Sequence, residues 1–139
     1  MRPFSLAGLL RVRTIQERSA AEDLSRAAVA RRQTEAREHH LRNALSAGDS
    51  SATDVHTLAA LAATRVSSRH QLSDLRLLGQ TQDADLAAAR ARHQSARIEE
   101  HGLTKLADAH ARSEFDRLLH AEQQELDEIA VRPRPEEPN

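Results

Sequence analysis

The feature that most constrains this chain is a long stretch without proline, which runs from Phe4 to Arg132. Proline costs about 3 kcal/mol inside a helix, so this stretch permits helices much longer than those of a typical globular domain. All four prolines lie outside it, at positions 3, 133, 135 and 138. Their placement predicts that helix occupies nearly the whole chain and stops close to its ends.

The composition favours helix but provides little material for a core. Phe4 and Phe115 are the only aromatic residues among 139, and most of the apolar content is Ala and Leu. Ala and Leu mixed with Arg and Glu at helical spacing are typical of a coiled coil. We therefore expect an all-α protein in which residues 1–139 form a single coiled-coil unit.

Charge and cysteine content exclude several classes of protein. The 20 basic and 21 acidic residues are interspersed, whereas nucleic-acid binding needs a basic stripe, so we expect no nucleic-acid partner. The absence of cysteine excludes disulfides and thiol catalysis. No apolar run is long enough to span a membrane, and Arg11 and Arg13 directly follow the short apolar N-terminus. We expect that segment to be retained and the protein to be cytoplasmic.

One internal segment, residues 46–54, interrupts the helical pattern, because Gly, Ser and Asp cluster there. Gly48 suits the position after a helix end, and Asp54 or Thr53 suits the N-cap of the next helix. The sequence thus predicts a first helix over about residues 5–45, a loop over 46–54, a second helix over about 55–130 and a disordered tail over 131–139. Helices joined by a short loop pack antiparallel, so we expect an antiparallel two-helix coiled-coil hairpin with a longer second helix.

Both predicted helices carry a seam with the alternating four- and three-residue spacing of a coiled coil. In the first helix, seven of the twelve positions are apolar: Leu6, Leu10, Arg13, Glu17, Ala20, Leu24, Ala27, Arg31, Thr34, Glu38, Leu41 and Leu45. In the second helix the series begins at Leu58 and Leu61, and it includes Arg65, Ser68, Leu72, Leu75 with Leu78, Gln82, Leu86, Ala89, His93 and Ala96. From Leu103 to Phe115 the spacing becomes four residues throughout, which is a stutter.

A loop centred near residue 50 would place residue i opposite about residue 100 − i. Leu6 would then meet Gln94, and residues 95–130 would have no partner within the chain. That segment carries a strong apolar seam that includes Leu103, Phe115 and Leu126. Because an isolated helix is marginal in water, we expect the seam to be covered by an external partner or by self-association.

The sequence shows no pattern that indicates catalysis or metal binding. None of the eight histidines has another four residues away, which is the spacing of a helical metal site. Catalytic carboxylates need a pocket that shifts their pKa, whereas adjacent carboxylates such as Glu99 and Glu100 lie on faces expected to be exposed. The four glycines never cluster into a phosphate-binding loop. We expect no enzyme activity and no cofactor.

The two ends of the chain resemble the FliJ family, the small coiled-coil components of the flagellar type III export apparatus. The opening pattern that carries the resemblance is Phe4-x-Leu6-x-x-Leu9-Leu10-x-Val12-Arg13-x-x-x-x-Glu17. The closing one is Arg112-x-Glu114-x-x-x-x-Leu119-x-x-Glu122-x-x-Glu125-Leu126-Asp127-Glu128-Ile129-Ala130-x-Arg132. Chain length, two-helix layout and loop position are similar to those of the family as well.

The resemblance implies a stalk whose open end, with both termini, enters the pore of the hexameric flagellar export ATPase and stimulates it. The residues implied in that contact are Phe4, Leu6, Leu10, Glu17, Phe115, Leu119, Glu122, Leu126, Asp127, Glu128 and Ile129. The half near the loop is implied to contact the membrane export gate through Leu41, Leu45, Leu58, Leu61 and Ala62, although this chain lacks the aromatic residues that some members use there. The family also binds export chaperones, and the resemblance places the protein at the inner face of the cell membrane only through protein partners.

Two alternatives remain open at the level of sequence. One is the equivalent stalk of a virulence injectisome, although the Leu-Asp-Glu block at residues 126–128 favours the flagellar version. The other is a structural coiled-coil scaffold that self-associates through residues 95–130 into a four-helix assembly. A stable dimer or tetramer would distinguish this scaffold from a stalk.

Overall fold

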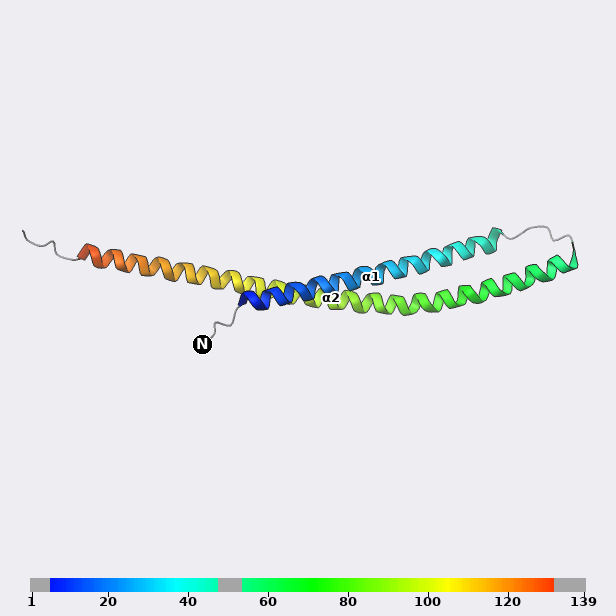
Figure 1. The fold of residues 1–139 in the computed structure, drawn as a ribbon, viewed down its shortest axis with the longest axis horizontal. Helices are drawn as coiled ribbons and strands as arrows, with labels where there is room; N and C mark the ends of the chain where they lie inside the picture. The colour runs from blue at the N-terminus through cyan, green and yellow to red at the C-terminus, as the bar shows by residue number, and fades with distance from the viewer. Residues whose placement is uncertain (1–5, 48–53, 132–139) are drawn as a thin grey trace, which may run out of the picture.

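The computed structural model describes residues 6–47 and 54–131, and all of these except Asp54 lie in two helices. Helix α1 spans Leu6–Ala47 and helix α2 spans Val55–Val131. The two helices run antiparallel side by side, and α2 is much the longer (Figure 1). The predicted all-α antiparallel hairpin with a longer second helix is therefore confirmed.

The helix ends lie within two residues of the positions expected from the sequence. Ser46 and Ala47, which we assigned to the loop, form the last residues of α1 instead. The backbone carbonyl of Asp54 accepts a hydrogen bond of 2.9 Å from the backbone N–H of Leu58, as the residue before a helix does. Val131, which we assigned to the tail, is the last residue of α2. The predicted loop residues 48–53 and the tail residues 132–139 lie outside the described residues.

The seam predicted on α1 faces α2 along its whole length. Every one of its twelve positions, from Leu6 to Leu45, is buried or half-buried. On α2 the covered series is Leu61, Ser68, Leu72, Leu75, Gly79, Gln82, Leu86, Ala89, His93, Ala96, Glu100, Leu103 and Ala107. The prediction was wrong at Leu58, Arg65 and Leu78, which are exposed, and it missed Gly79 and Glu100.

The interior of the hairpin is one layer of mostly small or polar side chains. Among the described residues, Leu72, Ala89 and Thr34 have buried side chains, with exposed fractions of 8%, 2% and 2%. Gly79 is also buried, and a Cβ there would lie 3.2 Å from Oε1 of Glu38. Gly79 therefore marks a close approach of the two helices.

The pairing of the helices corrects the symmetric register that we predicted. Arg13 contacts Glu99, whereas the symmetric hairpin would place it opposite Ala87. Similarly, Arg31 contacts Asp83 in place of Arg69. Each α1 residue thus meets α2 about 10 to 14 positions further along than a loop centred at residue 50 would give.

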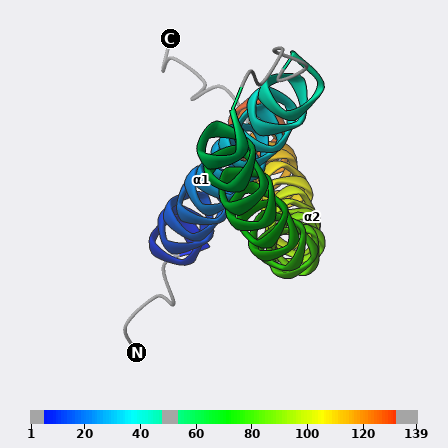
Figure 2. The same cartoon turned by 90° about the vertical axis from the view of Figure 1, so that its right-hand side faces the viewer.

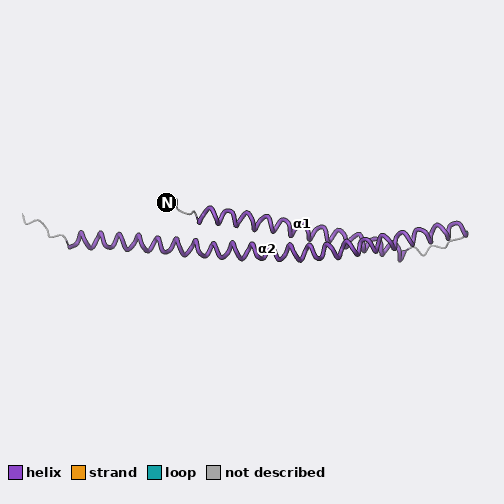
Figure 3. The backbone as a smooth tube through the Cα atoms, turned by 90° about the horizontal axis from the view of Figure 1, so that it is seen from below, coloured by secondary structure: helices purple, strands orange, loops and turns teal. Residues whose placement is uncertain are grey.

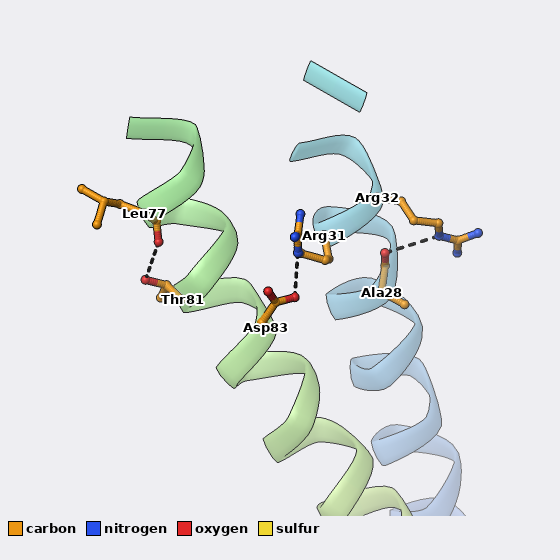
Figure 4. Close-up of polar contacts among 6 residues, drawn as sticks. All are labelled: Ala28, Arg31, Arg32, Leu77, Thr81 and Asp83. Carbon is orange, nitrogen blue, oxygen red and sulfur yellow. Dashed lines mark hydrogen bonds and ion pairs between the residues drawn. The ribbon is translucent and has the colours of Figure 1, made fainter. Parts of the chain in front are cut away.

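Charged residues within the seam explain this choice of register. The symmetric pairing would set Arg31 against Arg69 and Glu17 against Asp83, and like charges in contact are unfavourable. In the observed register, Arg31 Nε donates to Oδ1 of Asp83 at 2.6 Å (Figure 4). Glu17 Oε1 lies 2.8 Å from Nε2 of His93. The shift in register converts like-charge contacts into complementary ones.

Helix α2 extends past α1 at both ends (Figure 1). The axes of the two antiparallel helices are inclined to each other, so the helices cross (Figures 2 and 3). Near the loop, residues 54–60 are all exposed. At the far end, residues 108–131 are exposed except for half-buried Glu114. We call residues 108–131 the arm. The arm is shorter than the predicted 95–130 because the shifted register brings α1 against Leu103 and Ala107, which are half-buried.

Candidate binding surface

Among the described residues, six of the large apolar side chains that are left exposed lie on the arm. The exposed fraction is 62% for Phe115, 45% for Leu119, 64% for Leu126 and 66% for Ile129. Leu118 beside them is 61% exposed. Fully burying a side chain of this size is worth about 1.5 to 3 kcal/mol, so a partner that covers the arm gains substantial free energy.

A shallow groove runs along this part of the arm between two of the leucines. It is lined by Asp116, Leu119, His120, Glu122, Gln123 and Leu126. Its lining combines two leucines with two carboxylates, those of Asp116 and Glu122. Our sequence reasoning placed Leu119, Glu122 and Leu126 together at one contact and missed Asp116. Its position three residues before Leu119 and seven before Gln123 was the signal for it, since such spacings share a helix face.

The arm is acidic overall. It holds two arginines, Arg112 and Arg117, against seven acidic residues: Asp108, Glu114, Asp116, Glu122, Glu125, Asp127 and Glu128. In the described part of the chain, Arg117 pairs with Glu114 of the same arm at 2.6 Å. The four acidic residues beyond residue 120 have no arginine or lysine one turn away on the arm. This surface therefore suits a partner that is both apolar and basic.

The N-terminal residues predicted for the same contact lie elsewhere. Phe4 is outside the described residues, and Leu6 and Leu10 are half-buried in the seam against α2. Glu17 is held by its hydrogen bond to His93. At a rise of 1.5 Å per residue, Leu126 lies about 30 Å beyond the part of α2 that Leu6 faces. The structure therefore does not bring Leu6, Leu10 or Glu17 together with the C-terminal candidate residues (Figure 1).

Residues predicted near the loop form a second and smaller surface. Leu45 and Leu61 line a groove together with Ala44, Thr64, Arg65 and Ser68. Leu41 is half-buried in the seam, whereas Leu58 is 54% exposed and Ala62 is exposed. This end of the hairpin offers some apolar surface for a partner, but it consists of smaller side chains than the arm does.

The ion pairs between the helices hold the hairpin together. The hydrogen bond to Asp83 raises the pKa of Arg31, against the opposing effect of desolvation, so its guanidinium remains charged. Arg32 and Thr81 nearby bond to backbone carbonyls of their own helices, those of Ala28 and Leu77 (Figure 4). No group of three or more potential metal ligands occurs among the described residues.

Neither described helix is long and apolar enough to cross a membrane.

Comparison with known protein families decides the identity of the chain. The family model described as the flagellar FliJ protein matches residues 1–133, which is nearly the whole sequence. The chain belongs to the FliJ family. No curated protein and no solved structure matches it.

Membership of the FliJ family makes this chain a coiled-coil protein of flagellar export, and it implies interaction with the export machinery. The match includes α1 and all but the tail beyond residue 133, so the hairpin and the arm are both parts of the FliJ unit. The resemblance inferred from the two ends of the sequence is therefore confirmed. The contact residues assigned by that resemblance remain predictions.

Proposed function

We propose that this FliJ protein is a stalk that binds the hexameric flagellar export ATPase through its arm and stimulates ATP hydrolysis without being an enzyme itself. The observation that carries the proposal is the exposed apolar stripe of Phe115, Leu119, Leu126 and Ile129 on a helix that extends past its hairpin partner. The arm is a single helix about 36 Å long, which is a shape that can enter a pore.

The other end of the molecule provides the second half of this proposal. The hairpin holds the arm and the loop end far apart, so that a protein bound at one end does not touch the other (Figure 1). We assign the surface around Leu45, Leu58 and Leu61 to the membrane export gate. In this role the protein links the ATPase to the gate, carries export chaperones between them, and sits at the cytoplasmic face of the membrane through protein contacts alone.

The proposal is tested by ATP hydrolysis of the cognate export ATPase with and without this protein. We expect stimulation by the wild type, and we expect Leu119→Asp or Leu126→Asp to weaken binding by about tenfold or more, because each places a charge in an apolar contact. Leu77→Asp is the matched control, since Leu77 is 61% exposed on the hairpin and lies far from the arm. Equal stimulation by all four proteins, or none by the wild type, would refute the proposal.

A further inference from the structure

The apolar stripe of the arm does not continue the seam of the hairpin. Continued past Ala107, the seam spacing leads to His110, Glu114, Arg117 and Ala121, which are mostly polar. The apolar residues lie one or two positions later, at Phe115, Leu119, Leu126 and Ile129. Each residue turns the helix by about 100°, so the stripe faces a different side from the one that α1 covers. The change of side occurs where the described part of α1 begins, so the arm is not an unfilled length of the same groove.

Glu122 lies in the middle of this stripe. The series Phe115, Leu119, Glu122, Leu126, Ile129 has the four- and three-residue spacing of a coiled-coil seam, and Glu122 is its one charged member. No arginine or lysine lies three or four residues from Glu122 on the helix. No ion pair or hydrogen bond of its side chain occurs within the described residues. A partner that covers the stripe must therefore also supply a hydrogen-bond donor or a positive charge to the Glu122 carboxylate.

The hairpin shows how this chain treats acids at a seam. Glu17 lies 2.8 Å from His93, Glu100 accepts a hydrogen bond of 2.7 Å from Thr14, and Glu99 pairs with Arg13. Asp83 accepts from Arg31 in the same way. Each of these carboxylates meets a donor that the opposite helix supplies, whereas Glu38 of the same seam pairs with Arg42 of its own helix at 3.5 Å. Removing a carboxylate from water costs free energy unless such a donor replaces the water.

A second copy of this chain cannot supply that donor in the pairings that bury the whole stripe. In an antiparallel pair, Phe115 faces Ile129 and Leu119 faces Leu126, so Glu122 faces Glu122 on the two-fold axis. A parallel pair in register also sets Glu122 beside Glu122. If one helix of the antiparallel pair is shifted by three residues, Glu122 lies opposite Leu119 and Ile129 lies opposite Arg112. Every such arrangement buries an unpaired or like-charged carboxylate, which works against association.

We propose that the occupant of the stripe is a different protein whose apolar surface donates an arginine or lysine to Glu122, and that Glu122 acts against self-pairing of the arm. This inference rests on the proposed function, with the export ATPase as the partner. The excess of carboxylates on the arm extends the same charge complementarity around the stripe. Glu122 thus determines which partner the arm accepts, while the four apolar residues provide the contact area.

The test compares three substitutions in the full-length protein. Glu122→Gln keeps the size of the side chain and removes its charge, and we expect it to bind the cognate ATPase about tenfold more weakly than the wild type. Glu125→Gln removes a charge next to the stripe but outside its spacing, and we expect affinity within about twofold of wild type. Glu122→Leu completes the apolar seam, and we expect it to form dimers that light scattering detects at concentrations where the wild type is monomeric.

The outcomes separate this inference from the proposed function. Binding by the wild type that Glu122→Gln leaves unchanged would overturn the role of Glu122 and leave the stalk proposal intact. A wild-type protein that is itself a stable dimer through the arm would also overturn it. Failure of the wild type to bind the ATPase at all would overturn the proposed function and the partner named here together.

Discussion

Single residues within the seam determine how the two helices of this FliJ protein fit. Arg31 and Asp83 pair across the interface, and Gly79 admits the side chains of Arg31 and Glu38 to within 3.5 Å of the place a Cβ would take. Gly102 lies further along α2 and has nothing within 4 Å of that place. The two glycines have the same helix propensity, so only their surroundings distinguish the effects of replacing them.

Substitutions at these two glycines should therefore differ. Gly102→Ala should raise the free energy of unfolding by about 1 kcal/mol, which is the difference in helix propensity. Gly79→Ala should gain less, because its Cβ lies 3.2 Å from Oε1 of Glu38 and 3.4 Å from Cζ of Arg31. Gly79→Leu should lower stability by about 1 to 3 kcal/mol, whereas Gly102→Leu should not. Thermal unfolding followed by circular dichroism measures all four, and equal effects at the two sites would contradict the close approach at Gly79.

At the scale of the elements, the helices were predictable and their register was not. The absence of proline and the seam spacing gave α1 and α2 to within two residues, because both signals are local to one helix. The register depends on which charges meet across the interface, as Arg13 and Glu99 do, and on how the chain turns between the helices. The simplest assumption was a loop centred between two symmetrically paired helices. That assumption placed every predicted contact about three helical turns away from the contact observed on α2. The predicted length of the arm was wrong for the same reason.

Cross-linking tests the register directly, since the chain contains no cysteine of its own. The double variant Arg13→Cys with Glu99→Cys should react rapidly with a short bismaleimide, because the two side chains are in contact. Arg13→Cys with Ala87→Cys represents the symmetric register, and it should not react within the molecule because position 87 lies about 18 Å away along α2. Rapid intramolecular cross-linking of the second pair but not of the first would show that the helices pair in the symmetric register.

At the scale of the whole molecule, the hairpin and the arm have separate roles. The seam residues of α1 are buried or half-buried against α2, whereas the apolar stripe of the arm is exposed. The sequence identified Phe115, Leu119, Leu126 and Ile129 as candidate contacts because their spacing lacked an internal match. It also grouped Leu6, Leu10 and Glu17 with them through the family resemblance. Those three also belong to the seam predicted on the first helix, and in the structure they are half-buried there against α2.

The measurement that tests this division most directly is hydrogen exchange along the whole chain, with and without the cognate export ATPase. In the free protein, amides of residues 108–131 should exchange faster than those of residues 61–107, because an uncovered helix opens more easily than a paired one. Adding the ATPase should slow exchange in residues 108–131 by tenfold or more, on the order of the 1.4 kcal/mol or more expected from burying the stripe, and should leave residues 61–107 nearly unchanged. Protection that appears along the hairpin while the arm continues to exchange freely would contradict the assignment of the arm as the binding element.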